Sequence, residues 1–181
     1  LKIYGIAAIS FALLALVLLL ASIVGQGYSA FTQTHIRLDV AFAQERIDPD
    51  GSGKPETITR GDYDSLARDA IRARFPDVKG RRDRIRLAKL LSSSAGDKLR
   101  AMVLDEPGLI GKTRPVWLLA SDDIDMFAKG YAERNAQGGA QKLTAAQLSW
   151  YDKLNKAGAV SQRFNTRFLT SGDSREHERA G

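Results

Sequence analysis

Three aspartates follow a short apolar run near the middle of the chain, in "VWLLASDDIDMFAKG" (residues 116–130). Asp122, Asp123 and Asp125 could bind a divalent cation or do acid–base chemistry, because carboxylates serve in both roles. The same residues suit a helix start. Ser121 is a favourable N-cap, and first-turn carboxylates stabilise the helix dipole by about 0.3–1 kcal/mol each. With no histidine or cysteine nearby to complete a transition-metal site, the sequence favours a capped helix over the cation or catalytic role.

A second candidate cation site is the loop "DPDGSGKPETIT" (residues 48–59), which imitates a calcium-binding EF-hand. Oxygen-bearing side chains alternate from Asp48 to Ser52, and Gly53 lies at the sharp turn. Thr59, however, occupies the position of the bidentate glutamate that calcium needs. An Asp/Gly turn is therefore favoured over a calcium site.

Nucleophilic or histidine-based catalysis has little support in the sequence. The chain has no cysteine, and its two histidines, His35 and His177, have no nucleophile at a recognisable spacing. The "GKT" of residues 111–113 lacks the upstream glycine and the apolar strand of a phosphate-binding P-loop. We therefore predict no enzyme, no cofactor and no metal site.

The main charge feature is the segment of residues 60–91, where ten Lys/Arg and five Asp give a net +5 of the chain's +6. Its centre, "KGRRDRIRLAK" (residues 79–89), predicts an anion-binding or membrane-facing patch made of Arg81, Arg82, Arg84, Arg86 and Lys89. A solvated helix face explains the same residues without any ligand. Nucleic acid is disfavoured as a partner, because no aromatic residue lies between Phe75 and Trp117 for base stacking.

Periodicity predicts the elements that must position these groups. Apolar patterns predict strands over residues 35–42, 116–120 and 160–169. Helical spacing predicts helices over residues 62–75, 81–91 and 95–104. Thr144 and Gln147 predict a capping box for a later helix, and Ser94 with Asp97 predict a variant of it. With the first and last strands paired, the expected fold class is α+β, with helices packed on a small, mainly antiparallel sheet.

The N-terminal run "IYGIAAISFALLALVLLLASIV" (residues 3–24) contains no ionisable group. As a helix it would be roughly 33 Å long, enough to cross a bilayer, and it is too long for a cleavable signal peptide. It is apolar on every side, which disfavours a buried core helix. We therefore predict an uncleaved transmembrane anchor helix over residues 1–26 and one folded domain over residues 27–175.

Four separated blocks carry a family resemblance: "IYGIAAI", "GYSAFTQTHIRLDV", "PGLIGKTRPVWLLASDDIDMFAKG" and "RFNTRFLTSGDSREHERAG". In this order they resemble the N-terminal region of the PstA-type permease subunit of bacterial phosphate ABC transporters, in the form that carries a long extra domain of unknown function. The resemblance covers essentially the entire chain. Arg167 and Leu169 depart from it where more aromatic or apolar residues are expected, and His177 stands where proline is expected.

The resemblance implies an inner-membrane location, with a cytoplasmic N-terminus, a periplasmic domain, and residues 176–181 leading into the next membrane helix. The implied partners are a second permease subunit, a cytoplasmic ATPase subunit, a periplasmic phosphate-binding protein and membrane lipid. The expected function is that of an N-terminal fragment of the phosphate-import permease, whose insert is structural, regulatory or a docking surface. The alternative is a membrane-anchored extracytoplasmic sensor or ligand-binding domain. No functional residue is carried over, because those that move phosphate are expected outside this sequence.

Overall fold

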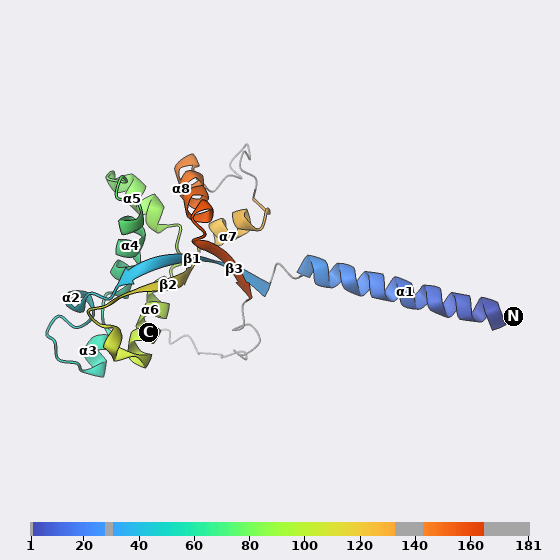
Figure 1. The fold of residues 1–181 in the computed structure, drawn as a ribbon, viewed down its shortest axis with the longest axis horizontal. Helices are drawn as coiled ribbons and strands as arrows, with labels where there is room; N and C mark the ends of the chain where they lie inside the picture. Colours follow the sequence, from blue (N-terminus) through green and yellow to red (C-terminus); the bar gives the residue numbers. More distant parts are fainter. Residues whose placement is uncertain (1, 28–30, 133–142, 165–181) are drawn as a thin grey trace, which may run out of the picture. The chain divides into compact units, whose positions relative to one another are not determined.

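The computed structural model describes residues 2–27, 31–132 and 143–164 of the chain (Figure 1). The chain divides into two compact units. The first comprises residues 1–33 with residues 164–181, and the second comprises Thr34–Arg163. Residues 176–181, for which a lead-in to the next membrane helix was predicted, lie outside the described residues.

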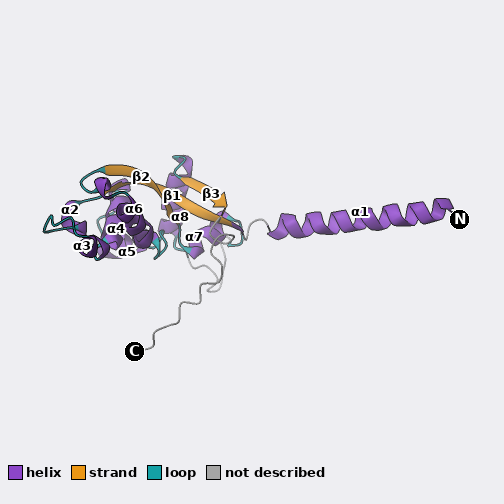
Figure 2. Ribbon diagram, turned by 90° about the horizontal axis from the view of Figure 1, so that it is seen from below, coloured by secondary structure: helices purple, strands orange, loops and turns teal. Residues whose placement is uncertain are grey.

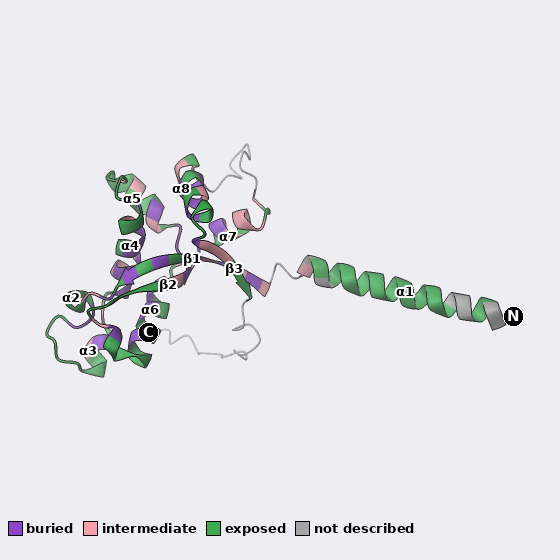
Figure 3. Ribbon diagram, viewed as in Figure 1, coloured by how far each residue is buried: buried purple, intermediate pink, exposed green. Residues whose placement is uncertain are grey.

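The first unit contains helix α1 (Lys2–Gly27), whose described large apolar side chains, such as Phe11 at 74 % exposure, are open to solvent (Figure 3). No helix within the described residues is both long and apolar enough to cross a membrane, so the predicted transmembrane anchor over residues 1–26 is wrong.

The sheet of the second unit has three strands, β1 (Thr32–Ala41), β2 (Thr113–Leu119) and β3 (Val160–Phe164), in the order β2-β1-β3. The first two strands pair antiparallel, with Ile36 opposite Leu118 and Asp39 opposite Pro115. The small sheet among helices confirms the α+β part of the predicted fold class. It also confirms that the first and last strands are neighbours.

The helices that follow are short. Their bounds are α2 (Gln44–Ile47), α3 (Pro55–Thr59), α4 (Tyr63–Arg74), α5 (Arg81–Ala88), α6 (Ala95–Asp105), α7 (Asp122–Ala128) and α8 (Ala145–Lys156), with a 3-10 turn η2 (Pro107–Leu109) before β2. In Figure 2 the helices of this unit gather on one side of the sheet. One layer of helices on one sheet face gives a single apolar core.

The alternation of β1 directs its side chains to opposite faces of the sheet. Ile36, Leu38 and Val40 are buried, whereas Arg37 and Asp39 are exposed. The buried face packs with apolar residues of the helices and of β2 into one core, whose fully buried members include Ile71, Leu87, Leu99, Leu118, Ile124 and Leu154. Hydrophobic burial on one face of the sheet therefore fixes which charges face solvent.

Two local predictions need correction or extension. Ser94 is the N-cap of α6, but its side chain makes no capping hydrogen bond, so the predicted variant capping box with Asp97 is wrong. The Ser94 hydroxyl instead lies 3.0 Å from the hydroxyl of Ser92. β3 ends at Phe164, and residues 165–169 of the predicted strand lie outside the described residues.

Candidate functional site

The predicted basic patch lies on and just after α5. All five of its residues, Arg81, Arg82, Arg84, Arg86 and Lys89, are exposed. Two of them have partners within the same segment. Arg86 forms an ion pair of 3.2 Å with Asp83, and the Arg84 Nε donates a hydrogen bond of 3.2 Å to the Val78 carbonyl oxygen. Exposed pairs of this kind contribute little to stability, about 0–1 kcal/mol, and leave the patch accessible.

A cavity of about 390 Å³ lies between α4, the end of α5 and the start of α6. We call it the basic cavity. Three cationic side chains line it, Arg68, Arg72 and Lys89, together with the carboxylate of Asp64. The remaining lining is Ala67, Ile85, Ala88, Leu91, Ser92, Ser93 and Ala95. Of the five residues in the predicted patch, only Lys89 lines this cavity.

The two arginines of the basic cavity are held by carboxylates that are not part of its lining. Arg68 lies 3.8 Å from Asp62, and Arg72 lies 3.2 Å from Asp69. Arg46 pairs with the same two carboxylates, at 3.6 Å and 3.7 Å. Because each carboxylate is shared between two guanidinium groups, neither arginine is fully neutralised by its own partner.

The start of α4 fixes one of those carboxylates. Asp62 is the N-cap of α4, and its side chain accepts hydrogen bonds from the amide and the hydroxyl of Ser65. The hydrogen bond from the Ser65 hydroxyl, with the charges of Arg68 and Arg46, holds the pKa of Asp62 below its ordinary value. Asp62 is therefore a carboxylate at neutral pH and keeps Arg68 at the cavity.

A sequence reading misses Arg68 and Arg72, because they lie in a helix whose periodicity indicates only an amphipathic element. The available signal was their spacing. Residues four apart share one face of a helix, and Arg68 and Arg72 have that spacing. What no spacing shows is that Lys89, from the next helix, reaches the same cavity.

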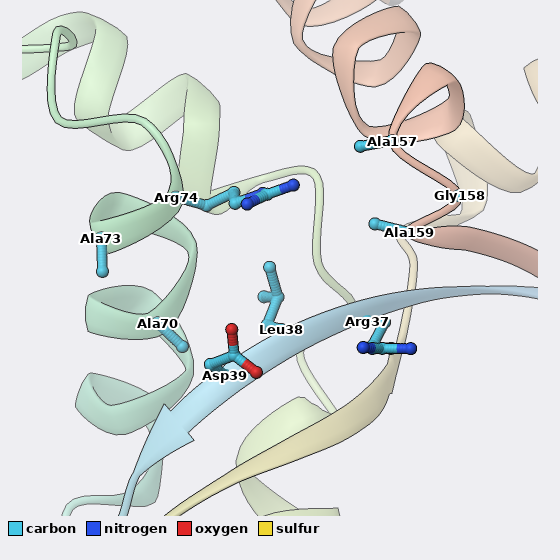
Figure 4. A pocket seen from close by; sticks show the side chains of 9 residues that line it. All are labelled: Arg37, Leu38, Asp39, Ala70, Ala73, Arg74, Ala157, Gly158 and Ala159. Atoms are coloured by element: carbon cyan, nitrogen blue, oxygen red, sulfur yellow. The ribbon is translucent and has the colours of Figure 1, made fainter.

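A second hollow, of about 280 Å³, lies between β1, α4 and the end of α8 (Figure 4). Leu38 points into it from β1, and Arg74 reaches across it from α4 toward Ala157. The charged lining is Arg37, Arg74 and Asp39, so both signs are present. This mixture selects no ligand class as clearly as the basic cavity does.

Of the three aspartates after β2, Asp125 has a structural role. Asp125 accepts a hydrogen bond of 2.7 Å from the Thr34 amide of β1 and forms an ion pair of 2.6 Å with Lys129. Ser121 is the N-cap of α7 by position, but its side chain makes no capping hydrogen bond, so the predicted cap is wrong in that respect. Its hydroxyl oxygen is buried and has no hydrogen-bond partner among the described residues.

The loop that resembles an EF-hand is stabilised by hydrogen bonds between its own residues. Asp48 accepts hydrogen bonds from the Gly53 amide, at 2.6 Å, and from the Ser52 hydroxyl, at 3.1 Å. The Gly53 bond holds the pKa of Asp48 below its ordinary value. Gly51 and Gly53 have φ of 62° and 64°, which glycine adopts without strain. This is the predicted Asp/Gly turn, and no metal-ligand cluster occurs among the residues that the structure describes.

Comparison with known families places the chain. A family described as a domain of unknown function, DUF3333, matches residues 1–138. The chain belongs to the DUF3333 family. No curated protein and no solved structure matches it. The family match therefore brings no activity with it for this DUF3333 protein.

Proposed function

We propose that this DUF3333 chain is an N-terminal part of the permease subunit of a phosphate-import ABC transporter. In this proposal it works at the bacterial inner membrane with a second permease subunit, a cytoplasmic ATPase subunit and a periplasmic phosphate-binding protein. The α+β unit lies on the periplasmic side as a structural, regulatory or docking surface. ATP hydrolysis belongs to the ATPase subunit, so the chain itself is no enzyme. The proposal rests first on the four sequence blocks that resemble the PstA-type permease.

The structural observation that supports it is the apolar surface of α1. The exposed side chains of this helix include Phe11, Leu13, Leu16 and Leu20. A contiguous apolar surface of this kind is unfavourable in water and marks an interaction site. Apolar helices of a permease assembly would bury it, at roughly 25 cal/mol per Å² of apolar area removed from water.

The test is made in the intact gene, with the codons for residues 34–163 replaced by a short Gly/Ser linker. We expect lower uptake of radiolabelled phosphate, because the periplasmic surface is lost. Uptake of a solute carried by an unrelated ABC importer should not change, which controls for cell health. In a parallel experiment the tagged wild-type protein should co-purify with the ATPase subunit in mild detergent. Unchanged phosphate uptake together with no co-purification would show that the proposal is wrong.

The basic cavity favours one alternative, an extracytoplasmic sensor or ligand-binding domain. A cavity in which a few polar groups converge among apolar side chains is typical of a small-molecule site, and the basic cavity has both kinds of lining. A sensor would leave uptake unchanged after the same replacement and would alter a transcriptional response instead. The uptake experiment therefore separates the two functions.

A further inference from the structure

The guanidinium group of Arg72 has an unexplained polar atom. Its Nε is buried and has no hydrogen-bond partner among the described residues. A buried donor without a partner costs about 1–3 kcal/mol. Native proteins rarely keep such a donor, and a bound ion or water is a common explanation. Arg72 lines the basic cavity, so a ligand there contacts its side chain, whereas the Nε atom itself is enclosed by protein.

The charges around the basic cavity indicate the sign of that ligand. Arg68, Arg72 and Lys89 line it against a single carboxylate, Asp64. Lys89 forms no ion pair with any residue in the described part of the chain. The cavity therefore has an excess of positive charge and selects an anion.

Asp64 does not cancel this excess at the cavity's centre, because it packs against the start of α6. A Cβ on Gly96 would collide with the Asp64 carboxylate, so the two residues are in close approach. There the carboxylate meets the positive end of the α6 dipole. Asp64 therefore already occupies the start of α6. The groups that remain to bind a ligand are the cationic side chains of Arg68, Arg72 and Lys89.

Neutral donors and apolar groups complete the lining. Ser92 and Ser93 contribute hydroxyl groups to the lining, and Ile85, which is 51 % exposed, contributes an apolar side chain. Guanidinium, ammonium and hydroxyl groups together suit a tetrahedral oxyanion, to which arginine donates in a fork. The volume of about 390 Å³ and the apolar wall leave room for an esterified group as well as for the free ion.

We propose that the basic cavity of Arg68, Arg72 and Lys89 binds a phosphate-type oxyanion, either free inorganic phosphate or a phosphate monoester of the glycerol 3-phosphate type. This site is independent of the transporter assignment, since it rests on the cavity alone. The predicted patch on α5 contributes Lys89 to it. Arg81 and Arg82 remain on the surface outside the cavity.

The experiment is calorimetric titration of the 181-residue chain in non-ionic detergent with inorganic phosphate, and separately with glycerol 3-phosphate. Lys89→Gln removes one lining cation without breaking an ion pair of the fold, and Arg72→Gln removes the group with the buried Nε. We expect each variant to weaken binding about 10-fold, or 1.4 kcal/mol. Arg81→Gln and Arg82→Gln are matched controls from the same basic segment and should bind as the wild type does. Thermal unfolding without ligand shows that each variant is folded.

Preference for inorganic phosphate identifies the free ion, and preference for glycerol 3-phosphate identifies the ester; either supports the site. The proposal is overturned if neither compound binds at millimolar concentration. It is equally overturned if Arg81→Gln and Arg82→Gln weaken binding as much as Lys89→Gln, because the anion would then respond only to surface charge. Folded Lys89→Gln protein with unchanged affinity would also overturn it, even where Arg72→Gln fails to fold.

Discussion

The helices α7 and α8 begin with similar backbone geometry, but different contacts stabilise their first turns. Each starts after a hydroxyl residue with extended backbone, Ser121 at ψ 158° and Thr144 at ψ 156°. The Thr144 hydroxyl accepts a hydrogen bond from the Gln147 amide, and the Gln147 side chain accepts one from the Thr144 amide. The Ser121 hydroxyl makes no such bond.

The difference lies three residues after the cap. In α8 that position is Gln147, whose side chain reaches back to the cap and also donates to the Arg86 carbonyl oxygen. In α7 it is Ile124, which is fully buried and has no polar side-chain group. The reciprocal bond of a capping box is therefore impossible at α7, although the backbone N–H of Ile124 is the same kind of donor as that of Gln147. The start of α7 is held instead by the hydrogen bond that Asp125 accepts from the Thr34 amide of β1.

The largest expected effect comes from Asp125→Ala. It leaves the Thr34 amide without its acceptor and removes the carboxylate that pairs at 2.6 Å with Lys129, whose side chain is only 9 % exposed. Removing one partner from such groups costs about 1–3 kcal/mol for the hydrogen bond and more for a buried charge. We expect a loss of roughly 3 kcal/mol in the free energy of unfolding, measured by urea denaturation.

The control is Asp122→Ala, which removes an exposed carboxylate from the same helix. It should cost less than about 1 kcal/mol, the range of a dipole interaction. Equal losses from the two variants would mean that the contact with β1 does not fasten α7.

Local sequence patterns gave the strands and the α8 cap because both depend on neighbours in the chain. The alternation of Ile36, Leu38 and Val40 is sufficient to predict which face of β1 is buried. The Asp125 contact with Thr34 joins residues that are 91 positions apart, and no spacing indicates it. Only part of the basic cavity could be predicted from the sequence. Lys89 belongs to an evident basic run, but its meeting with α4 depends on tertiary packing.

Thr144→Ala should have an intermediate effect. It removes the hydroxyl that accepts from the Gln147 amide, and losing a cap of this type costs about 0.5–2 kcal/mol. Thr144→Ser keeps the hydroxyl and should unfold close to the wild type in the same urea experiment. If the serine variant loses as much stability as the alanine variant, the methyl group rather than the cap stabilises the start of α8.

Ser121→Ala should have the smallest effect, and this is the sharpest test of the comparison. The Ser121 hydroxyl oxygen is buried and has no hydrogen-bond partner among the described residues. Burying an unpaired hydroxyl costs free energy, so its removal should leave stability within about 0.5 kcal/mol of the wild type or raise it. Thr34→Val removes a second unpaired buried hydroxyl of the same kind and should behave alike. A loss near 1 kcal/mol or more for Ser121→Ala, matching that of Thr144→Ala, would mean that Ser121 caps α7 in solution and that the two helix starts do not differ.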